Sequence, residues 1–183
     1  MKPYRVALVQ QETRVIVDTS QRDDIIQANL SRILELTDWT TMRLGGVKLA
    51  MFSEYGIIGQ FRPRSVEEWL ELAETIPGDV TEKIGAKAKA LGMHIAGNLF
   101  ERDADWPGRL LNTSFIVSPE GKVILKYRKH NGPNNLNTTY TGPGDIYSGY
   151  VQRYGEEALF PVVDTEIGRL ACMSCTDVVF PEM

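Results

Sequence analysis

The chain has 183 residues, of which 43% are hydrophobic and 24% are charged, and its formal net charge is −4. These values are ordinary for one soluble globular domain with a real core, and they exclude a disordered or low-complexity polypeptide. The lysines and arginines form no cluster that stands clear of neighbouring acids, so nothing favours a nucleic-acid partner or an anionic membrane surface. We expect the partners to be small molecules or further copies of the chain.

The N-terminal segment and the cysteines indicate a compartment. MKPYRVALVQ leads directly into a strand-like run that is too short and too polar-flanked for a signal peptide or a membrane span. We therefore expect a cytoplasmic protein without a membrane segment. The only two cysteines, Cys172 and Cys175, are then expected to be reduced thiols.

The first half of the chain predicts alternating strands and helices. Residues 4–10 and 48–53 are short apolar runs, and residues 21–43 between them carry apolar side chains at helical spacing. Two strands separated by a long helix form a βαβ unit, so the pair is expected to be parallel. Two further helices are predicted over residues 62–76 and 80–91.

The second half predicts strands and one long loop. Strands are predicted over residues 93–100, 109–117, 122–127, 159–164 and 169–174. The second and third of these are joined by Ser-Pro-Glu-Gly, a tight turn, and should form an antiparallel hairpin. The segment from residue 130 to 157 is rich in Asn, Gly, Pro and Tyr with little apolar period, so we expect a loop there. The sequence thus predicts an α/β fold whose sheet combines parallel crossovers with a hairpin.

Three reactive side chains each follow an apolar strand. Glu54 comes after the strand at 48–53, Lys129 after the strand at 122–127, and Cys175 after the last strand. Taken alone, each residue is most simply interpreted as having no catalytic role, because a Glu or Lys at the end of a strand is normally just solvated. The crevice outside the carboxyl ends of the strands is, however, where ligands bind in α/β sheets. The shared position of Glu54, Lys129 and Cys175 at strand ends therefore favours a single ligand-binding site that contains all three.

The surroundings of Cys175 suit a nucleophile. The apolar run stops there, and residues 178–182 read as the opening of a helix, whose N–H groups and dipole favour a thiolate. Cys172 lies inside the strand and fits a small buried hydrophobe. A CxxC redox pair is an alternative reading. A structural zinc site is disfavoured, because there is no second CxxC and the only histidines are His94 and His130.

The chemistry that such a trio suits is acyl transfer. Glu54 can act as general base for Cys175 and then return the proton to a leaving ammonia. Lys129 and the backbone N–H of Thr176 can stabilise the oxyanion that forms on attack. A thioester would remain on the cysteine, and water activated by the glutamate would hydrolyse it.

Four motifs carry a resemblance to a known family. They are FSEYG at 52–56, YRKH at 127–130, TGPGD at 141–145 and GRLACMSCTDVVFPE at 168–182. In this order and spacing they resemble the nitrilase, or carbon–nitrogen hydrolase, superfamily over essentially the whole chain. The resemblance implies a four-layer α-β-β-α sandwich and a catalytic triad of Glu54, Lys129 and Cys175.

The resemblance also implies hydrolysis of a non-peptide C–N bond without a metal or an organic cofactor. It implies a homodimer or larger homo-oligomer, with the helix after the cysteine in the interface. The sequence Cys175-Thr-Asp is similar to the amidase and carbamoylase branches, whereas nitrilases usually carry Cys-Trp-Glu there. We therefore expect a small amide as substrate, with N-carbamoyl compounds and nitriles as alternatives.

Two departures from the family pattern shape the remaining expectations. The family has a second Glu in the loop after the Lys. This chain has no counterpart to it, because residues 131–144 contain neither Asp nor Glu. We expect Asn134 and Asn135, together with Tyr55 and Thr176, to surround the substrate or the oxyanion. The candidates for the role of the missing Glu are Asn134, Asn135 or Asn137 as neutral hydrogen-bonding residues, and otherwise Glu156 or Glu157 from further along the chain.

The second departure is length. Family domains run well past this chain, so residues 1–183 are expected to be a single domain that forms an N-terminal portion and is incomplete at its C-terminus. A catalytically silent relative that serves as a binding or assembly module is the alternative function. Release of ammonia from amides would distinguish the two.

Overall fold

The computed structural model describes residues 3–59, 63–130 and 140–181. Within these ranges, five strands form one sheet in the order β1-β2-β3-β4-β5, and two form a separate hairpin. The sheet strands are β1 (Arg5–Val9), β2 (Val47–Phe52), β3 (His94–Arg102), β4 (Leu110–Val117) and β5 (Val123–Arg128). The hairpin consists of β6 (Val162–Thr165) and β7 (Gly168–Ala171).

Strand directions bring several strand ends to one edge of the sheet. β1, β2 and β3 are parallel, while β4 is antiparallel to both β3 and β5. The predicted parallel βαβ unit and the predicted hairpin are therefore confirmed. β5 consequently runs in the same direction as β2 and β3. The carboxyl ends of these three strands lie at one edge, beside the beginning of β4.

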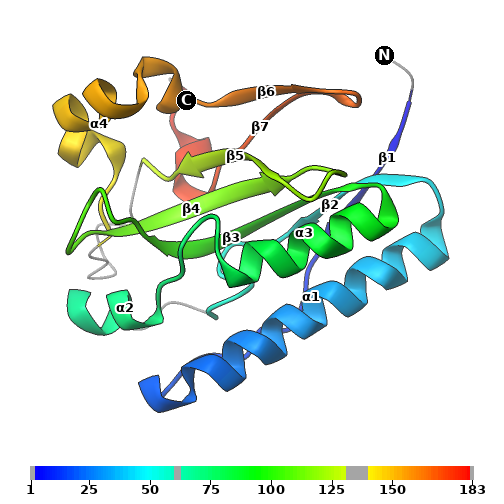
Figure 1. Cartoon of the computed structure of the whole chain (residues 1–183), viewed down its shortest axis with the longest axis horizontal. Helices are drawn as coiled ribbons and strands as arrows, with labels where there is room; N and C mark the ends of the chain where they lie inside the picture. The colour runs from blue at the N-terminus through cyan, green and yellow to red at the C-terminus, as the bar shows by residue number, and fades with distance from the viewer. Residues whose placement is uncertain (1–2, 60–62, 131–139, 182–183) are drawn as a thin grey trace.

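The elements are stacked in layers. The long helices α1 (Arg22–Leu44) and α3 (Asp79–Leu91) lie side by side on one face of the sheet, and the β6–β7 hairpin covers part of the other (Figure 1). The short helix α2 (Val66–Leu72) packs against β3 and β4. Helices, sheet and hairpin follow one another as expected for the α-β-β part of the predicted sandwich, which confirms the α/β class.

Alternation along the strands produces one core on each face of the sheet. Ala50 of β2 belongs to the core beneath the helices, where Ile26, Leu30 and Ile33 of α1 are also buried. Its neighbour Leu49 points to the other face and packs with Ile167 of the hairpin. Because successive side chains of a strand point to opposite faces, β2, β3 and β4 contribute to both cores.

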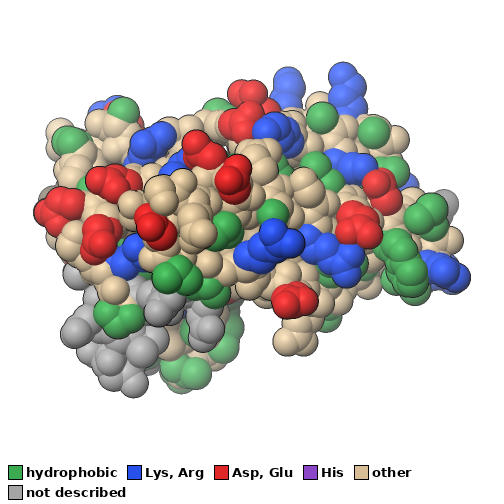
Figure 2. Space-filling model, turned by 90° about the horizontal axis from the view of Figure 1, so that it is seen from below, with side chains coloured by type: hydrophobic (Ala, Val, Ile, Leu, Met, Phe, Trp, Pro, Cys, Tyr) green, Lys and Arg blue, Asp and Glu red, His purple; other side chains and the backbone are tan. Residues whose placement is uncertain are grey.

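The outer surface of the helix layer carries charges of both signs. Figure 2 shows Lys and Arg side chains interspersed with Asp and Glu side chains on this face. Several form ion pairs, including Lys83 with Asp79 and Lys87 with Asp38. No large field of one sign develops over this face. In the described ranges, no helix is long and apolar enough to cross a membrane.

Two predicted helical boundaries differ from the structure. The helix expected over 62–76 is shorter, because the chain after α2 becomes extended and Glu74 bonds to the backbone of β3. The helix expected after Cys175 is a short 3-10 turn that includes the cysteine itself, Cys175–Val179.

The segment predicted as a loop over 130–157 contains a helix, α4 (Tyr147–Tyr154). Its tyrosines at positions 147, 150 and 154 have helical spacing, but the surrounding glycines and prolines obscure the period. Tertiary contacts support the helix, since Arg128 lies over the rings of Tyr150 and Tyr154 and Trp106 stacks on Tyr150. The prediction of a loop was therefore wrong for this part.

A buried charge cluster joins β3, β4 and β5 on the helix side of the sheet. Glu101, which is 1% exposed, accepts hydrogen bonds from Arg128 (3.0 Å), Lys126 (2.8 Å) and Thr113 (2.7 Å). Arg128 also bonds Asp103. Burial alone would raise the pKa of Glu101, but the bonds and charge of Arg128 and Lys126 outweigh it and hold that pKa below its ordinary value.

We predict that Glu101→Gln lowers the free energy of unfolding at pH 7 by about 3 to 5 kcal/mol, because it leaves the Arg128 guanidinium buried without its main charge partner. The lowered pKa of Glu101 means that its stabilisation is present above the ordinary carboxyl pKa and is lost as the pH falls through the folded-state value. The difference between variant and wild type should therefore shrink in acid. Urea denaturation at pH 7 and at successively lower pH measures both effects.

Arg32→Ala provides the control, because the Arg32–Glu35 pair is exposed on α1. Its effect should stay within about 0.5 kcal/mol at every pH. An equally small effect of Glu101→Gln at pH 7 would contradict the role given to the cluster.

Candidate active site

The structure brings Glu54 and Lys129 together at the shared edge of the sheet. Glu54 follows β2, and Lys129 follows β5. The Lys129 ammonium lies 2.7 Å from Oε1 of Glu54, with the lysine side chain 1% exposed and the glutamate side chain 17% exposed. A charge this deeply buried requires a partner, because an unpaired ammonium would lose its hydration without compensation.

The alternation of β5 aims Lys129 at this site. Arg128 points to the helix side and joins the Glu101 cluster, so Tyr127 and Lys129 point to the hairpin side. The backbone N–H of Lys129 donates to the carbonyl oxygen of Asn112 at 2.8 Å, which continues the β4–β5 pairing by one residue. The ammonium is therefore placed by the sheet itself.

Two buried asparagines form a hydrogen-bonded chain that ends at the same oxygen of Glu54. Asn112 Nδ2 donates to Glu54 Oε1 at 2.8 Å, and Asn98 Nδ2 donates to Asn112 Oδ1 at 2.7 Å. Asn98 Oδ1 accepts the backbone N–H of Tyr55 at 3.1 Å. Sequence reasoning missed both residues. The available signal was an amide side chain in the interior of each of two strands that are otherwise mostly apolar.

Cys175 begins its turn in an unusual backbone conformation. It has φ +50°, and Tyr55 has φ +63°; among the described residues these two are the non-glycine residues with positive φ. The left-handed region is sparsely populated by residues with a side chain, and such strain gathers at functional sites. The Cys175 residue is exposed, and both cysteines are free thiols.

A buried hydrogen bond ties the cysteine turn to β5. Asp177, two residues after Cys175, is fully buried and accepts the hydroxyl of Tyr127 at 2.6 Å. Burial raises the pKa of the Tyr127 hydroxyl, and its bond to Asp177 adds to the effect. Tyr127 thus fixes the cysteine turn, while Lys129 on the same face of the strand fixes Glu54.

One cavity of about 400 Å³ is lined by both Glu54 and Cys175. The pKa values of two tyrosines, Tyr55 and Tyr140, are affected by both Glu54 and Cys175. Burial is the main cause of the raised pKa of Tyr55 and of Tyr140, followed by the negative charge of Glu54, and a thiolate at Cys175 adds to both. The ring of Tyr140 also lies 5.9 Å from the Lys129 ammonium. The carboxylate, the ammonium and the thiol therefore share one neighbourhood.

The other predicted site residues have different positions. Thr176 is half-buried in the cysteine turn, and Tyr55 follows Glu54 directly. Asn134 and Asn135, with the alternative Asn137, lie outside the described residues. Glu156 and Glu157 are exposed in a short turn after α4.

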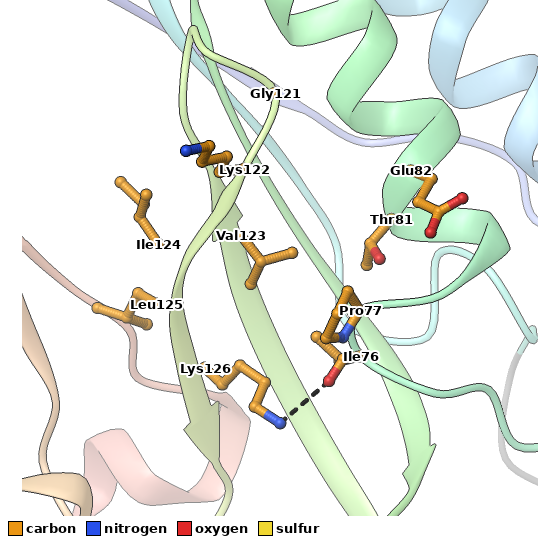
Figure 3. A pocket seen from close by; sticks show the side chains of 10 residues that line it. All are labelled: Ile76, Pro77, Thr81, Glu82, Gly121, Lys122, Val123, Ile124, Leu125 and Lys126. Carbon is orange, nitrogen blue, oxygen red and sulfur yellow. Dashed lines mark hydrogen bonds between the residues drawn. The ribbon is translucent and has the colours of Figure 1, made fainter.

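A second hollow, between α3 and β5, has a volume of about 570 Å³ and no comparable chemistry (Figure 3). Its charged groups Lys122 and Glu82 point in opposite directions. Lys126 is bonded to the carbonyl oxygen of Ile76 at 3.2 Å and to Glu101. Across the part of the chain that the structure describes, no group of three His, Cys, Asp or Glu side chains is placed to hold a metal ion.

Comparisons with known proteins identify the family of the chain. A family model described as carbon-nitrogen hydrolase matches residues 5–183. The chain is 31% identical to omega-amidase NIT2 of Bos taurus over 123 residues, which cover 66% of this chain and 41% of that protein. It is 28% identical to a formamidase of Bacillus thuringiensis (strain Al Hakam) over 181 residues, which cover 98% of this chain and 48% of that protein.

A solved structure shares the fold. The crystal structure of Saccharomyces cerevisiae Nit3, described as a member of branch 10 of the nitrilase superfamily, matches with a TM-score of 0.71 at 23% identity. The match covers 97% of this chain and 57% of that one. The chain thus spans about half the length of the relatives it matches.

We predict that iodoacetamide at pH 8 modifies Cys175 and spares Cys172 in the folded protein. Burial raises the pKa of the Cys172 thiol to about 12, so on the order of one molecule in ten thousand carries a thiolate there at pH 8. Cys175 is exposed and has no such shielding. Peptide mass spectrometry measures the ratio of the two modifications.

A Cys175→Ser variant is the control, since its remaining thiol should react only after unfolding in urea. Equal modification of both cysteines in the native protein would contradict the assignment. A reversible disulfide between Cys172 and Cys175 would support the redox reading instead.

Proposed function

Because the chain belongs to the carbon–nitrogen hydrolase family, we propose that it hydrolyses a small amide to an acid and ammonia, with Glu54, Lys129 and Cys175 as catalytic residues. The family membership confirms the resemblance to the nitrilase superfamily. The observation that carries the proposal is the buried Lys129–Glu54 pair beside a cavity that Cys175 also lines.

In the proposed first step, Glu54 takes the proton of the Cys175 thiol while the sulfur attacks the carbonyl carbon of the amide. The carbonyl oxygen becomes an oxyanion, which the Lys129 ammonium and the backbone N–H of Thr176 stabilise. A donor of this kind contributes about 3 kcal/mol to the transition state in a site shielded from water. The left-handed backbone of Cys175 would present the sulfur at the beginning of its turn.

In the second step, Glu54 returns its proton to the leaving nitrogen, the C–N bond breaks, and ammonia departs. A thioester then links the acyl group to Cys175. Water, losing a proton to Glu54, attacks the thioester carbon and releases the acid, and the proton returns to the sulfur. Glu54 thus changes between base and acid within one turnover.

Three observations support an amide as substrate. The relatives named as omega-amidase and formamidase act, by their names, on amides. The cavity of about 400 Å³ lies toward the small end of ligand pockets. Asp177, which the resemblance associates with the amidase and carbamoylase branches, is buried against Tyr127, so it would position the nucleophile. N-carbamoyl compounds and nitriles are the alternative substrates.

We also propose that the chain self-associates through the segment after the nucleophile. Val178, Val179 and Phe180 are exposed apolar residues there, and the family resemblance assigns this segment to the dimer interface. Sedimentation measured over a range of protein concentrations tests this proposal.

We predict that the protein releases ammonia from at least one member of a panel of aliphatic amides, carbamoyl compounds and nitriles. Cys175→Ala should abolish the release, because no nucleophile remains. Lys129→Met should lower kcat at least about 100-fold, because the oxyanion loses its cation. A coupled assay for ammonia measures both effects.

Lys87→Met is the matched control, because Lys87 also pairs with a carboxylate, that of Asp38, but on the helix face remote from the cavity. Its activity should equal that of the wild type. An absence of ammonia release from every compound would support the silent binding or assembly module, and unchanged activity of Cys175→Ala would refute the proposed nucleophile.

A further inference from the structure

We propose that Asn112 is a positioning residue that, through a relay of side-chain amides from Asn98, selects which oxygen of Glu54 exchanges protons. The inference rests on the proposed function of Glu54 as the base. Asn98 and Asn112 lie within the sheet rather than at the strand ends. In the proposed relay, one oxygen of the Glu54 carboxylate accepts the structural hydrogen bonds and the other exchanges protons.

Asn112 and Lys129 donate to the same oxygen of the Glu54 carboxylate. Oε1 of Glu54 accepts Asn112 Nδ2 at 2.8 Å and Lys129 Nζ at 2.7 Å. A carboxylate oxygen offers about two lone-pair sites, so these two bonds saturate Oε1. The other oxygen, Oε2, accepts neither of these two bonds, and in the proposed relay it is the oxygen that receives the proton from the thiol.

The orientation of the Asn112 amide is fixed by Asn98. Asn98 Nδ2 donates to Asn112 Oδ1 at 2.7 Å, which leaves Asn112 Nδ2 to face Glu54. Asn98 is 4% exposed and Asn112 is 1% exposed, so water has little access to compete for these bonds. A buried amide network in which each group has a partner has one preferred arrangement.

Asn98 also reaches Glu54 along the backbone. Its Oδ1 accepts the N–H of Tyr55, the residue after Glu54, at 3.1 Å. Tyr55 has a left-handed φ of +63°, which a residue with a side chain adopts only when its surroundings hold it there. Asn98 thus fixes the carboxylate by two routes, through Asn112 and through the turn at Tyr55.

Asn112 controls the other half of the pair as well. Its carbonyl oxygen accepts the backbone N–H of Lys129 at 2.8 Å, while its side chain binds Glu54. The register of β3 and β4 makes the relay possible, because Asn98 is opposite Ser114 and Asn112 is opposite Phe100. The two asparagines are therefore diagonal neighbours on one face of the sheet.

The chemistry of the relay requires an amide at position 112. The residue must accept from Asn98 and donate to Glu54 with one short side chain, and it must remain neutral. A carboxylate there would place a second negative charge against Glu54. An apolar residue would remove the closer of the two acceptors of the Asn98 amide, leaving Ser114 Oγ at 3.2 Å.

The test compares Asn112→Ala, Asn112→Asp and Asn98→Ser with the wild type on the best amide of the panel, measuring kcat and KM across pH. Loss of the Asn112 donor should lower kcat about 10- to 100-fold with KM within about threefold. The acid limb of the pH profile should move to higher pH, because the carboxylate form of the base loses a donor. Asn112→Asp should move it furthest, and Asn98→Ser should act in the same direction with a smaller shift.

Asn29→Ala is the matched control. Asn29 is 2% exposed and makes three hydrogen bonds to Arg14 and Ile57 from α1, so its loss should reduce the melting temperature without moving the pH profile of the folded fraction. An acid limb and a kcat unchanged in both Asn112→Ala and Asn98→Ser would overturn the inference, as would the same pH shift in Asn29→Ala.

Glu54→Gln separates this inference from the proposed function. If Glu54→Gln loses activity while the asparagine variants keep theirs, the relay is wrong and the base assignment stands. If Glu54→Gln is as active as the wild type, the proposed function of Glu54 fails, and the relay fails with it.

Discussion

The buried ion pair between Lys129 and Glu54 is the interaction on which the rest of the site depends. Removing an ammonium from water costs several kcal/mol, and the fold recovers this only because a carboxylate lies 2.7 Å away. The same desolvation strengthens the field of both charges, since electrostatic interactions gain strength where water is excluded. The attraction within the ion pair does little more than offset its desolvation cost in the free energy of folding. The same pair is nevertheless well suited to stabilise charge that develops during a reaction.

Strand β5 organises the site by the simplest property of a strand, its alternation. Arg128 points to the helix side, where Glu101 holds it, and this anchors the end of the strand. Tyr127 and Lys129 point to the hairpin side. There Tyr127 binds Asp177 in the cysteine turn, and Lys129 binds Glu54. Three consecutive residues thus connect the Glu101 cluster, the cysteine turn and Glu54.

The sequence predicts the strands and their ends, because apolar runs and the polar residues that stop them are local patterns. Glu54, Lys129 and Cys175 could therefore be singled out before the structure was known. Asn98 and Asn112 could not, because their relation depends on the register between β3 and β4, which neither strand reveals alone. Helix α4 and the 3-10 form of the cysteine turn were likewise missed, because contacts with Trp106 and Arg128, and with Tyr127, stabilise them.

The proposed roles of Lys129, Glu54 and Cys175 are tested most directly by a crystal structure of the Cys175→Ala variant with the amide that the wild type hydrolyses best. We predict that the amide carbonyl oxygen lies within hydrogen-bonding reach, about 2.7–3.1 Å, of the Lys129 ammonium, with the amide nitrogen beside Glu54 and the carbonyl carbon facing position 175. An amide bound away from the ion pair, or with its oxygen pointing away from Lys129, would contradict it.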